Sequence, residues 1–563
     1  MLKSSLQTCL FLLISIYSSL SPINKYMKIN LTKVFSTLSV IVFLSNSTYA
    51  AQGIDEKIND AFAPIANAWE SFVFTSIPVN ESLSIPIVLI ALIGGALFFT
   101  IYFSFVNIRK FPMAIKVVQG KYDFVEGNGK KAADDPTVLS SKEEGKRDGE
   151  VSHFQALTAA VSGTVGLGNI AGVAVAIAVG GPGATFWMIL AGLLGMSSKF
   201  VECTLGVKYR DVDKDGSIHG GPMYYLSKGF KEIKMAAAGK VLAIIFAILC
   251  VGASFGGGNA FQSNQAVAQI TSTFGLDGGF VKTLLGLTIA AIVAIVILGG
   301  IKRIAVWTER IVPFMAGLYV LACLIIIFAH INYIGAAFGL IFSEAFSPSA
   351  GLGGFLGVLI TGFRRAAFSN EAGVGSASIA HSAVKTRYPA SEGVVSLLEP
   401  FIDTVVICTM TALVIIFYNM DGVFEYGLTD ATGNVMIKAT GQSAGGVDLT
   451  TLAFDAVIPH FSYVLTVAIV LFAFSTMLSW SYYGLQAWKY LFGKSKISDL
   501  TYKVLFLLFI VVGAAATLDS VVKFSDAMIL AMVFPNMIGL VILSPKVKEE
   551  MNKYLKAIKA RFS

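Results

Sequence analysis

Residues 161–172, VSGTVGLGNIAG, bring helix-weakening glycines and hydrogen-bonding side chains into an apolar stretch of the chain. A glycine costs about 1 kcal/mol relative to alanine in a helix interior, so three within six residues predict an interrupted helix. The residues concerned are Ser162, Gly163, Thr164, Gly166, Gly168 and Asn169. At such a break, freed N–H groups can bind a carboxylate and freed carbonyl oxygens can bind a cation. Close helix packing through Gly168 and Gly172 would explain the glycines but not the polar side chains.

A second stretch, FRRAAFSNEAGVGSASIAHS at 363–382, has the same character. Its polar and flexible positions are Ser369, Asn370, Glu371, Gly373 and Gly375. An acidic side chain inside a membrane span costs several kcal/mol unless it is paired or faces water. Glu371 is therefore predicted to be functional, with Arg364 or Arg365 as its partner. The alternative is an interfacial glutamate on a helix that ends early.

Two further segments carry residue types that could complete a binding site. Ser475 and Thr476 are adjacent hydroxyls suited to a small monovalent cation, although such residues often bond back to their own helix carbonyls. Trp480 lies four residues later and therefore on the same helix face as Thr476. The amides of Gln262 and Gln265 could bind an ammonium or a carboxylate group, or could equally bridge neighbouring helices.

The rest of the chain consists largely of apolar segments that must hold these residues in place. Of the 563 residues, 55% are hydrophobic and 14% are charged, and the mean hydropathy is +0.73. This composition predicts an all-α polytopic membrane protein, because soluble domains carry about 25% charge and a spanning helix needs roughly 20 apolar residues. Eleven segments qualify as transmembrane helices: 84–107, 153–179, 184–206, 240–272, 280–299, 306–330, 352–383, 393–418, 460–488, 501–518 and 524–544.

Basic residues gather in alternate loops, which predicts an orientation in the membrane. The loops after the first, third and fifth segments are rich in Lys and Arg, whereas residues 331–351 contain neither. By the positive-inside rule, the mature N-terminus lies outside and the C-terminus in the cytoplasm of a bacterial inner membrane. Residues 27–50 have the features of a secretory signal peptide, with an uncleaved spanning helix as the alternative, and residues 1–26 look like a mis-called leader.

The remaining boundaries follow from these segments. Residues 51–83 are predicted to form a periplasmic segment, 84–107 an extra transmembrane helix, 108–152 a cytoplasmic loop and 545–563 a cytoplasmic tail. Two five-helix repeats, 153–330 and 352–544, are predicted to be inverted copies: VGLGNIA at 165–171 and VGSASIA at 374–380 share four of seven positions. The net charge of +7 is spread over short loops and the five cysteines stand singly, so we expect no nucleic-acid binding, disulfide framework or metal cluster.

Five ordered motifs resemble the alanine or glycine:cation symporter family over nearly the whole mature chain. They are SGTVGLGNIAGVA, GGPGATFWM, GNAFQSNQ, NEAGVGSASIAH and FSTMLSWSYYG. The resemblance implies the leucine-transporter fold, a ten-helix inverted repeat, and sodium-coupled uptake of small neutral amino acids by alternating access. The chain departs from the family pattern at Ser479, which precedes Trp480 where a glycine is usual.

The resemblance also implies roles for individual residues. Sodium, the expected coupling ion, would be bound by the carbonyls of Ser162 and Val165 and the hydroxyls of Ser475 and Thr476. The substrate carboxylate would meet N–H groups at Leu167 and Gly168 and the amide of Asn169. The pocket would be completed by Thr164, Gly166, Gln262, Ser369 and Asn370. Trp480 would form a wall that restricts the substrate to alanine or glycine.

Other functions remain as alternatives at this point. Protons could replace sodium as the driving ion, with Glu371 as the carrier. A membrane amino-acid sensor would need an output domain, and a membrane-embedded enzyme would need a nucleophile and base or a metal motif, neither of which the sequence offers. No phosphate-binding G-x-x-x-x-G-K-[ST] motif appears, so uphill transport would depend on an ion gradient. No obligate protein partner is predicted.

Overall fold

The computed structural model describes residues 54–80, 83–123, 125, 149–214, 216–276, 278–346, 354–430 and 434–562. The predicted leader at 1–26 and the predicted signal peptide at 27–50 lie outside the described residues. Within them the chain is predominantly helical, and its three β-hairpins are short and lie between helices.

The helices of the first half begin with a segment outside the predicted repeats. It comprises α3 (Ile54–Val73), the hairpin β1–β2 (Ser76–Asn80 and Leu83–Pro86), α4 (Ile87–Tyr102), α5 (Val106–Arg109) and α6 (Phe111–Val118). The helices that follow are α9 (His153–Thr164), α10 (Val173–Gly180), α11 (Gly183–Lys208), α12 (Pro222–Glu232), α13 (Ala236–Phe255), α14 (Phe261–Phe274), α15 (Val281–Ile297) and α16 (Gly300–Ala329). The hairpin β3–β4 (Asp211–Val212 and Ile218–His219) lies between α11 and α12.

The second half has the same helical character. Its helices are α17 (Ile334–Phe346), α18 (Gly354–Asn370), α19 (Ala377–His381), α20 (Pro389–Val395), α21 (Leu398–Pro400), α22 (Thr409–Tyr418), α23 (Val447–Asp455), α24 (Ser462–Phe492), α25 (Lys496–Ala515), α26 (Leu518–Ala531) and α27 (Val533–Phe562). The hairpin β5–β6 (Val435–Ile437 and Gln442–Ala444) and α23 lie within residues 419–459, the loop between the predicted segments 393–418 and 460–488.

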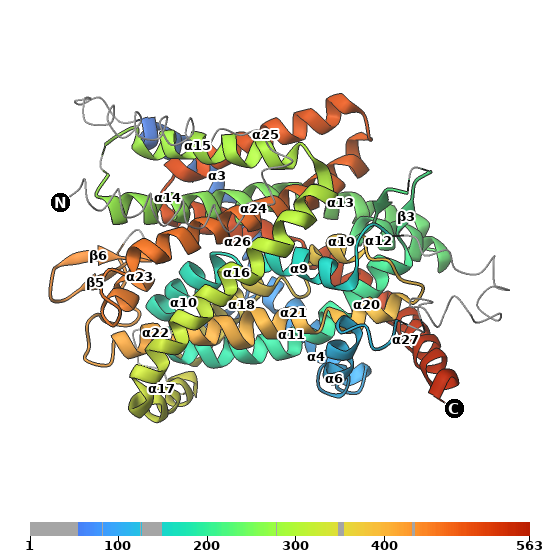
Figure 1. Ribbon diagram of the computed structural model, residues 1–563, viewed down its shortest axis with the longest axis horizontal. Coiled ribbons are helices and arrows are strands. Elements are labelled where there is room, and N and C mark those ends of the chain that lie inside the picture. Colours follow the sequence, from blue (N-terminus) through green and yellow to red (C-terminus); the bar gives the residue numbers. More distant parts are fainter. Residues whose placement is uncertain are drawn as a thin grey trace.

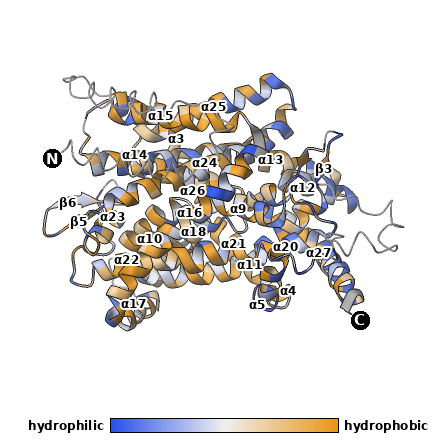
Figure 2. Cartoon of the chain, in the orientation of Figure 1, coloured by the Kyte–Doolittle hydropathy of each residue, from blue (hydrophilic) through white to orange (hydrophobic). Residues whose placement is uncertain are grey.

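Several helices are long and apolar enough to cross a membrane. Among the described residues, seven helices meet this criterion, or up to eight if the bent pair His153–Thr164 and Gly168–Gly180 is one span. Three shorter apolar helices, Ile87–Tyr102, Val281–Ile297 and Ile331–Phe346, accompany them. Figure 2 shows hydrophobic residues predominating along α10, α15 and α22 and hydrophilic residues around β3. Length and composition therefore support multiple spans, although fewer helices pass than the eleven segments predicted.

The two predicted interruptions lie at the centre of the molecule. α9 and the following helix are bent by 51° where α9 ends at Thr164 and the chain resumes as the π-helical turn Gly168–Gly172. The second interruption separates α18 from α19, and Glu371, Gly373 and Gly375 all have positive φ there. Figure 1 shows α9, α16 and α18 near the middle, with α24 and α26 on one side and α11 on the other. Both breaks therefore lie inside the molecule, surrounded by its longest helices (Figure 1).

Candidate functional site

The first break faces α24, and hydroxyl groups connect the two in both directions. Ser162 Oγ donates to the carbonyl of Ser475 at 2.9 Å, and Thr476 Oγ1 donates to the carbonyl of Ser162 at 3.1 Å. Ser475 Oγ bonds back to the Phe472 carbonyl of its own helix at 3.0 Å, whereas Thr476 is directed across to α9. All of these side chains are buried, so their oxygens form a compact set of hard ligands between two helices.

The main chain at the break already has polar partners. Gly166 N–H donates to Asn169 Oδ1 at 2.9 Å, and Leu167 N–H donates to Gln262 Oε1 at 3.1 Å. A Cβ added to Gly166 would lie 2.3 Å from Thr476 Oγ1 and 3.2 Å from Gln262 Oε1. Only glycine fits there, because the unwound backbone approaches both side chains this closely. At the first break, two main-chain N–H groups are therefore paired with side-chain acceptors of the protein, and their binding of a carboxylate stays a prediction.

The second break is connected to the first by a carboxylate that sequence reasoning missed. Asp403 Oδ1 accepts from Asn169 Nδ2 at 2.6 Å, and its Oδ2 accepts from Ser369 Oγ at 2.8 Å. Asn370 lies beside this group, since its Nδ2 donates to Thr404 Oγ1 at 2.8 Å. The signal in the sequence was an acidic residue inside the apolar run FIDTVVIC, at a point where the helix becomes π-helical.

Glu371 has partners other than those the sequence predicted. Its Oε1 accepts from Trp480 Nε1 at 2.9 Å, and Ser376 Oγ donates to its Oε2. The predicted pairing with Arg364 or Arg365 is wrong, because both guanidinium groups pair with Asp526. The residue is only 1% exposed, so its carboxyl group lies inside the protein. An aromatic N–H and a hydroxyl, rather than a cation, satisfy this carboxyl group directly.

Trp480, which donates to Glu371 at the second break, is also packed closely against another helix. A Cβ on Gly258 would come 2.1 Å from Trp480 Cγ, so the indole packs directly on the π-helical turn Gly256–Ala260. Gln262 follows that turn and donates from Nε2 to the Gly257 carbonyl at 2.9 Å. Trp480 and Gln262 therefore both contact the turn Gly256–Ala260, and their roles in a substrate pocket stay predictions.

Gln265, the other predicted amide, serves a different contact. Its Oε1 accepts from Val447 N–H at 3.0 Å, which connects α14 to α23 of the 419–459 loop. Thr450 of the same helix donates to the Ile170 carbonyl at 3.3 Å, within the π-helical turn after the first break. The helix-bridging alternative is thus the one observed for Gln265, and α23 covers one end of the candidate site.

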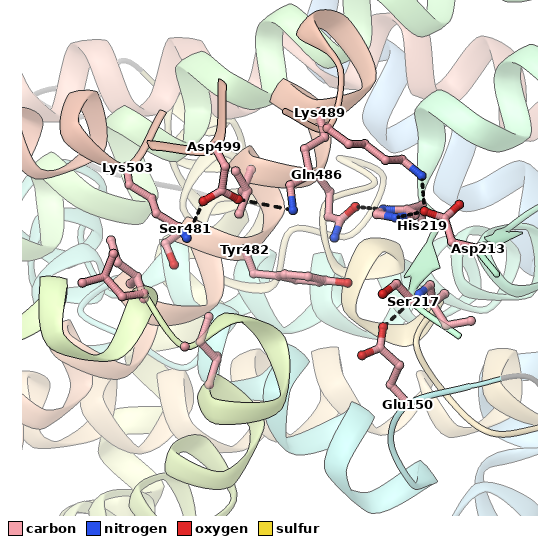
Figure 3. A pocket seen from close by; sticks show the side chains of 17 residues that line it. Glu150, Asp213, Ser217, His219, Ser481, Tyr482, Gln486, Lys489, Asp499 and Lys503 are labelled. Carbon is pink, nitrogen blue, oxygen red and sulfur yellow. Dashed lines mark hydrogen bonds and ion pairs between the residues drawn. The ribbon is translucent and has the colours of Figure 1, made fainter. Parts of the chain in front are cut away.

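A polar cavity of about 510 Å³ lies farther along α24 (Figure 3). Tyr482 and Gln486 line it, and Tyr482 follows Thr476 by six residues, about 9 Å along the helix. His219 Nδ1 bonds to Gln486 Oε1 at 2.7 Å and His219 Nε2 to Asp213 Oδ2 at 3.2 Å, so a row of polar groups crosses the opening. A hydrogen bond from Lys494 holds the pKa of Asp213 below its usual range. The cavity gives α24 a water-accessible end near the candidate site.

Comparisons with known proteins identify the family of this chain. Residues 70–563 match the profile described as the sodium:alanine symporter family. The chain belongs to the sodium:alanine symporter family. It is 40% identical over 494 residues to the sodium/alanine symporter AgcS of Methanococcus maripaludis, covering 88% of this chain and 97% of that protein. Members of the family are transporters rather than enzymes, and the apolar helices mark this symporter-family chain as a multi-pass membrane protein.

Two further similarities complete the comparison. The chain is 31% identical over 399 residues to the sodium/proton-dependent alanine carrier protein of Bacillus sp. (strain PS3), covering 70% of this chain and 85% of that one. A solved structure, MhsT in complex with L-phenylalanine, matches 71% of this chain and 100% of its own, with 15% identity and a TM-score of 0.45.

Proposed function

We propose that this protein is a sodium-coupled symporter that imports small neutral amino acids, alanine and glycine, by alternating access. The observation that carries the proposal is the reciprocal contact between Ser162 of the first broken helix and Ser475 and Thr476 of α24. A monovalent cation bound between these oxygens would hold two helices together, so its binding would favour one conformation over another. Such differential binding is what couples an ion gradient to a transport cycle.

Sodium suits this set of ligands. The carbonyls of Ser162 and Val165 and the hydroxyls of Ser475 and Thr476 are hard oxygen donors, and none of them carries a charge that would favour a divalent ion. Val165 follows the last residue of α9 and has a non-helical ψ of 88°. Its peptide group is therefore turned away from the hydrogen-bonding pattern of the helix. The M. maripaludis relative is named a sodium/alanine symporter, which supports the same ion.

The substrate would occupy the space between the two breaks. Its carboxylate would meet N–H groups around Leu167 and Gly168 and the amide of Asn169, and Gln262 would help to complete the pocket. Thr164, Gly166, Ser369 and Asn370 would complete the polar side of the pocket. Trp480 would limit the length of the substrate side chain, because its indole packs against a glycine backbone and is held by its hydrogen bond to Glu371.

The proposed architecture follows the sequence prediction. Eleven transmembrane helices comprise one extra N-terminal helix, 84–107, and two inverted repeats of five, each opening with a broken helix. The mature N-terminus lies outside a bacterial inner membrane and the tail at 545–563 lies in the cytoplasm. In this orientation the cavity beside Tyr482 and Gln486 opens toward the cytoplasm.

Proton coupling is the second candidate, and one observation favours it. The Bacillus relative is named a sodium/proton-dependent alanine carrier, and Glu371 is a buried carboxyl group at the second break. Sodium remains the first choice because the two donors to Glu371 are protein groups, whereas the oxygens of Ser162 and Thr476 suit a bare cation.

The deciding experiment is uptake of labelled alanine into proteoliposomes that contain the purified protein. An inward sodium gradient is compared with potassium or choline at constant pH and voltage. Accumulation with sodium alone supports the proposal and directs attention to Ser475 and Thr476. Equal accumulation without sodium, abolished when the proton gradient is dissipated, supports proton coupling through Glu371. The absence of accumulation under every gradient would contradict both candidates for this substrate.

A further inference from the structure

A row of ionisable side chains that the proposed transport site does not use crosses the interior near α9, α11 and α19. The row contains His153, Glu392, His381, Glu399 and Lys199, in this order. His153 Nδ1 contacts Glu392 Oε2, and Glu392 Oε1 contacts His381 Nδ1 at 2.6 Å. His381 Nε2 is 3.4 Å from Glu399 Oε2, and Lys199 Nζ is 3.2 Å from Glu399 Oε1. The contacts are therefore continuous from the start of α9 to the middle of α11.

The position of His381 requires an additional proton. Both of its ring nitrogens face carboxylate oxygens, of Glu392 on one side and Glu399 on the other. A neutral imidazole donates from one nitrogen only and would direct the lone pair of the other at a carboxylate. Either the ring is an imidazolium or one carboxyl group is protonated. In both cases the row holds one exchangeable proton.

The balance of charge leads to the same result. Glu392 and Glu399 are two carboxylates, and Lys199 is the permanent cation that faces them within the row. Since all three side chains are fully buried, an uncompensated charge there would be costly, and one proton makes the row neutral. Three further groups face Lys199 from neighbouring positions: Glu202, Cys203 and Glu371. Arg210 lies nearby, donating to the carbonyls of Ser382 and Val384 just after α19.

The row also joins the two broken helices. His153 is the first residue of α9, and His381 is the last residue of α19. Glu392 of α20 contacts both rings, so it bridges α9, which leads into the first break, and α19, which follows the second. His153 alone is partly exposed, at 11% of its side chain, whereas the other four are fully buried. The start of α9 is therefore the end of the row closest to water, although His153 Nε2 itself is buried.

We propose that this row is a proton-binding site, in which a proton bound among His381, Glu392 and Glu399 locks α9 and α19 together. The proton leaves the imidazolium through Glu392 to the ring of His153 and then to water, with no other reactant. The consequence for transport rests on the proposed function, in which this end of α9 faces the cytoplasm and must move for substrate to be released there.

The direction of the effect follows from linkage. The bridged state holds one more proton than a state in which Glu392 has lost a histidine, so acid stabilises the bridge and alkali weakens it. Raising the pH should therefore loosen the start of α9. The effect should disappear when either histidine can no longer carry or pass on the proton.

Hydrogen exchange tests this site without any assumption about the substrate. Protection factors, which already correct for the intrinsic pH dependence of exchange, are measured for the peptide His153–Thr164 in the purified full-length protein. We expect the protection factor to fall about tenfold between pH 6 and pH 9. A tenfold change corresponds to a difference of about one pKa unit between the bridged and the opened state. His153→Gln and Glu392→Gln should each reduce this change to within about twofold. His330→Gln is the control, because His330 contacts a carbonyl of its own helix, Ile326.

Two results would overturn the proposal. One is a wild-type protection factor for His153–Thr164 that does not change with pH, and the other is an unchanged pH dependence in His153→Gln. Because Glu392→Gln removes a buried charge and could impair folding, His153→Gln at the exposed end of the row is the decisive variant. Uptake of labelled alanine at different internal pH values forms the second arm. Failure of uptake with pH-dependent protection intact would contradict the proposed transport function and leave the proton site standing.

Discussion

The indole Nε1 of Trp480 donates to Glu371 Oε1 at 2.9 Å, which connects the predicted wall of the substrate pocket to the second helix break. Glu371 is held in turn by Ser376 and adopts a φ of 55°, a conformation that a non-glycine residue rarely takes. A strained backbone and two hydrogen bonds therefore determine where the indole lies. We infer that Glu371 positions Trp480 and through it determines the size of the accepted side chain.

Removing the acceptor should broaden selectivity. In Glu371→Ala the buried indole N–H loses its partner, at a cost of about 1–3 kcal/mol, and the ring is free to tilt. We expect Glu371→Ala and Trp480→Ala to let leucine and phenylalanine compete with labelled alanine, whereas Glu371→Gln keeps an acceptor oxygen and the original selectivity. Trp488→Ala, on the same helix but bonded to Ser498, is the control. Identical selectivity in Trp480→Ala would place this residue outside the pocket.

Sodium dependence should respond to Thr476. The Thr476→Ala substitution removes a hydroxyl that reaches the Ser162 carbonyl, and we expect the sodium concentration for half-maximal uptake to rise about tenfold. Thr476→Ser retains the hydroxyl and should stay close to wild type. Thr466→Ala changes another threonine of α24 that bonds to Gln269 and serves as the control. An unaltered sodium curve in Thr476→Ala, measured at equal expression, would exclude this residue from the site.

Two glycines near the first break provide a matched pair. A Cβ at Gly166 would meet Thr476 Oγ1 at 2.3 Å, whereas a Cβ at Gly172 would have none of the described residues within 4 Å. We expect Gly166→Ala to reduce initial uptake of alanine by about tenfold or more, because the unwound backbone could not approach α24 and Gln262. Gly172→Ala should transport like wild type. Equal activity of both variants would show that the close approach at Gly166 is not required.

The loop that covers the site should respond to pH through Asp448 of α23. Burial raises the pKa of this carboxyl group from its ordinary value of 3.8 to about 6, and its Oδ1 has no hydrogen-bond partner among the described residues. The folded state therefore binds the proton more tightly than the unfolded chain, so this contribution to stability is complete below pH 3.8 and is lost as the pH rises through 6.

Asp448→Asn should consequently stabilise the protein where the carboxyl group is charged. We expect its Tm in detergent to exceed that of wild type by about 1–2 °C at pH 7.5, with a smaller difference at pH 5. Asp455→Asn is the comparison within α23, because Asp455 accepts a hydrogen bond from Ser462 N–H. A lower Tm for Asp448→Asn at pH 7.5 would indicate that the charged form has a stabilising partner.

Local composition was sufficient to predict both helix interruptions. Three glycines within 163–168 weaken a helix whatever surrounds it, and the structure ends α9 at Thr164. The Ser-Asn-Glu run before Gly373 and Gly375 likewise marks the end of α18 at Asn370. The partners of Glu371 could not be predicted in this way. Arg364 and Arg365 are the cations nearest to Glu371 in the sequence, but both form ion pairs with Asp526, which is more than 150 residues away.

The sequence by itself determined the membrane class, the family and the positions of the two breaks, because hydropathy and glycine content act over a few consecutive residues. Only the tertiary structure decided which groups meet: Asp403 joins Asn169 to Ser369, and Glu392 joins His153 to His381. Each acid lies on a helix distant in the sequence from at least one of its partners. The cost of burying a charge requires such partners, but residue spacing along the chain does not indicate where they come from.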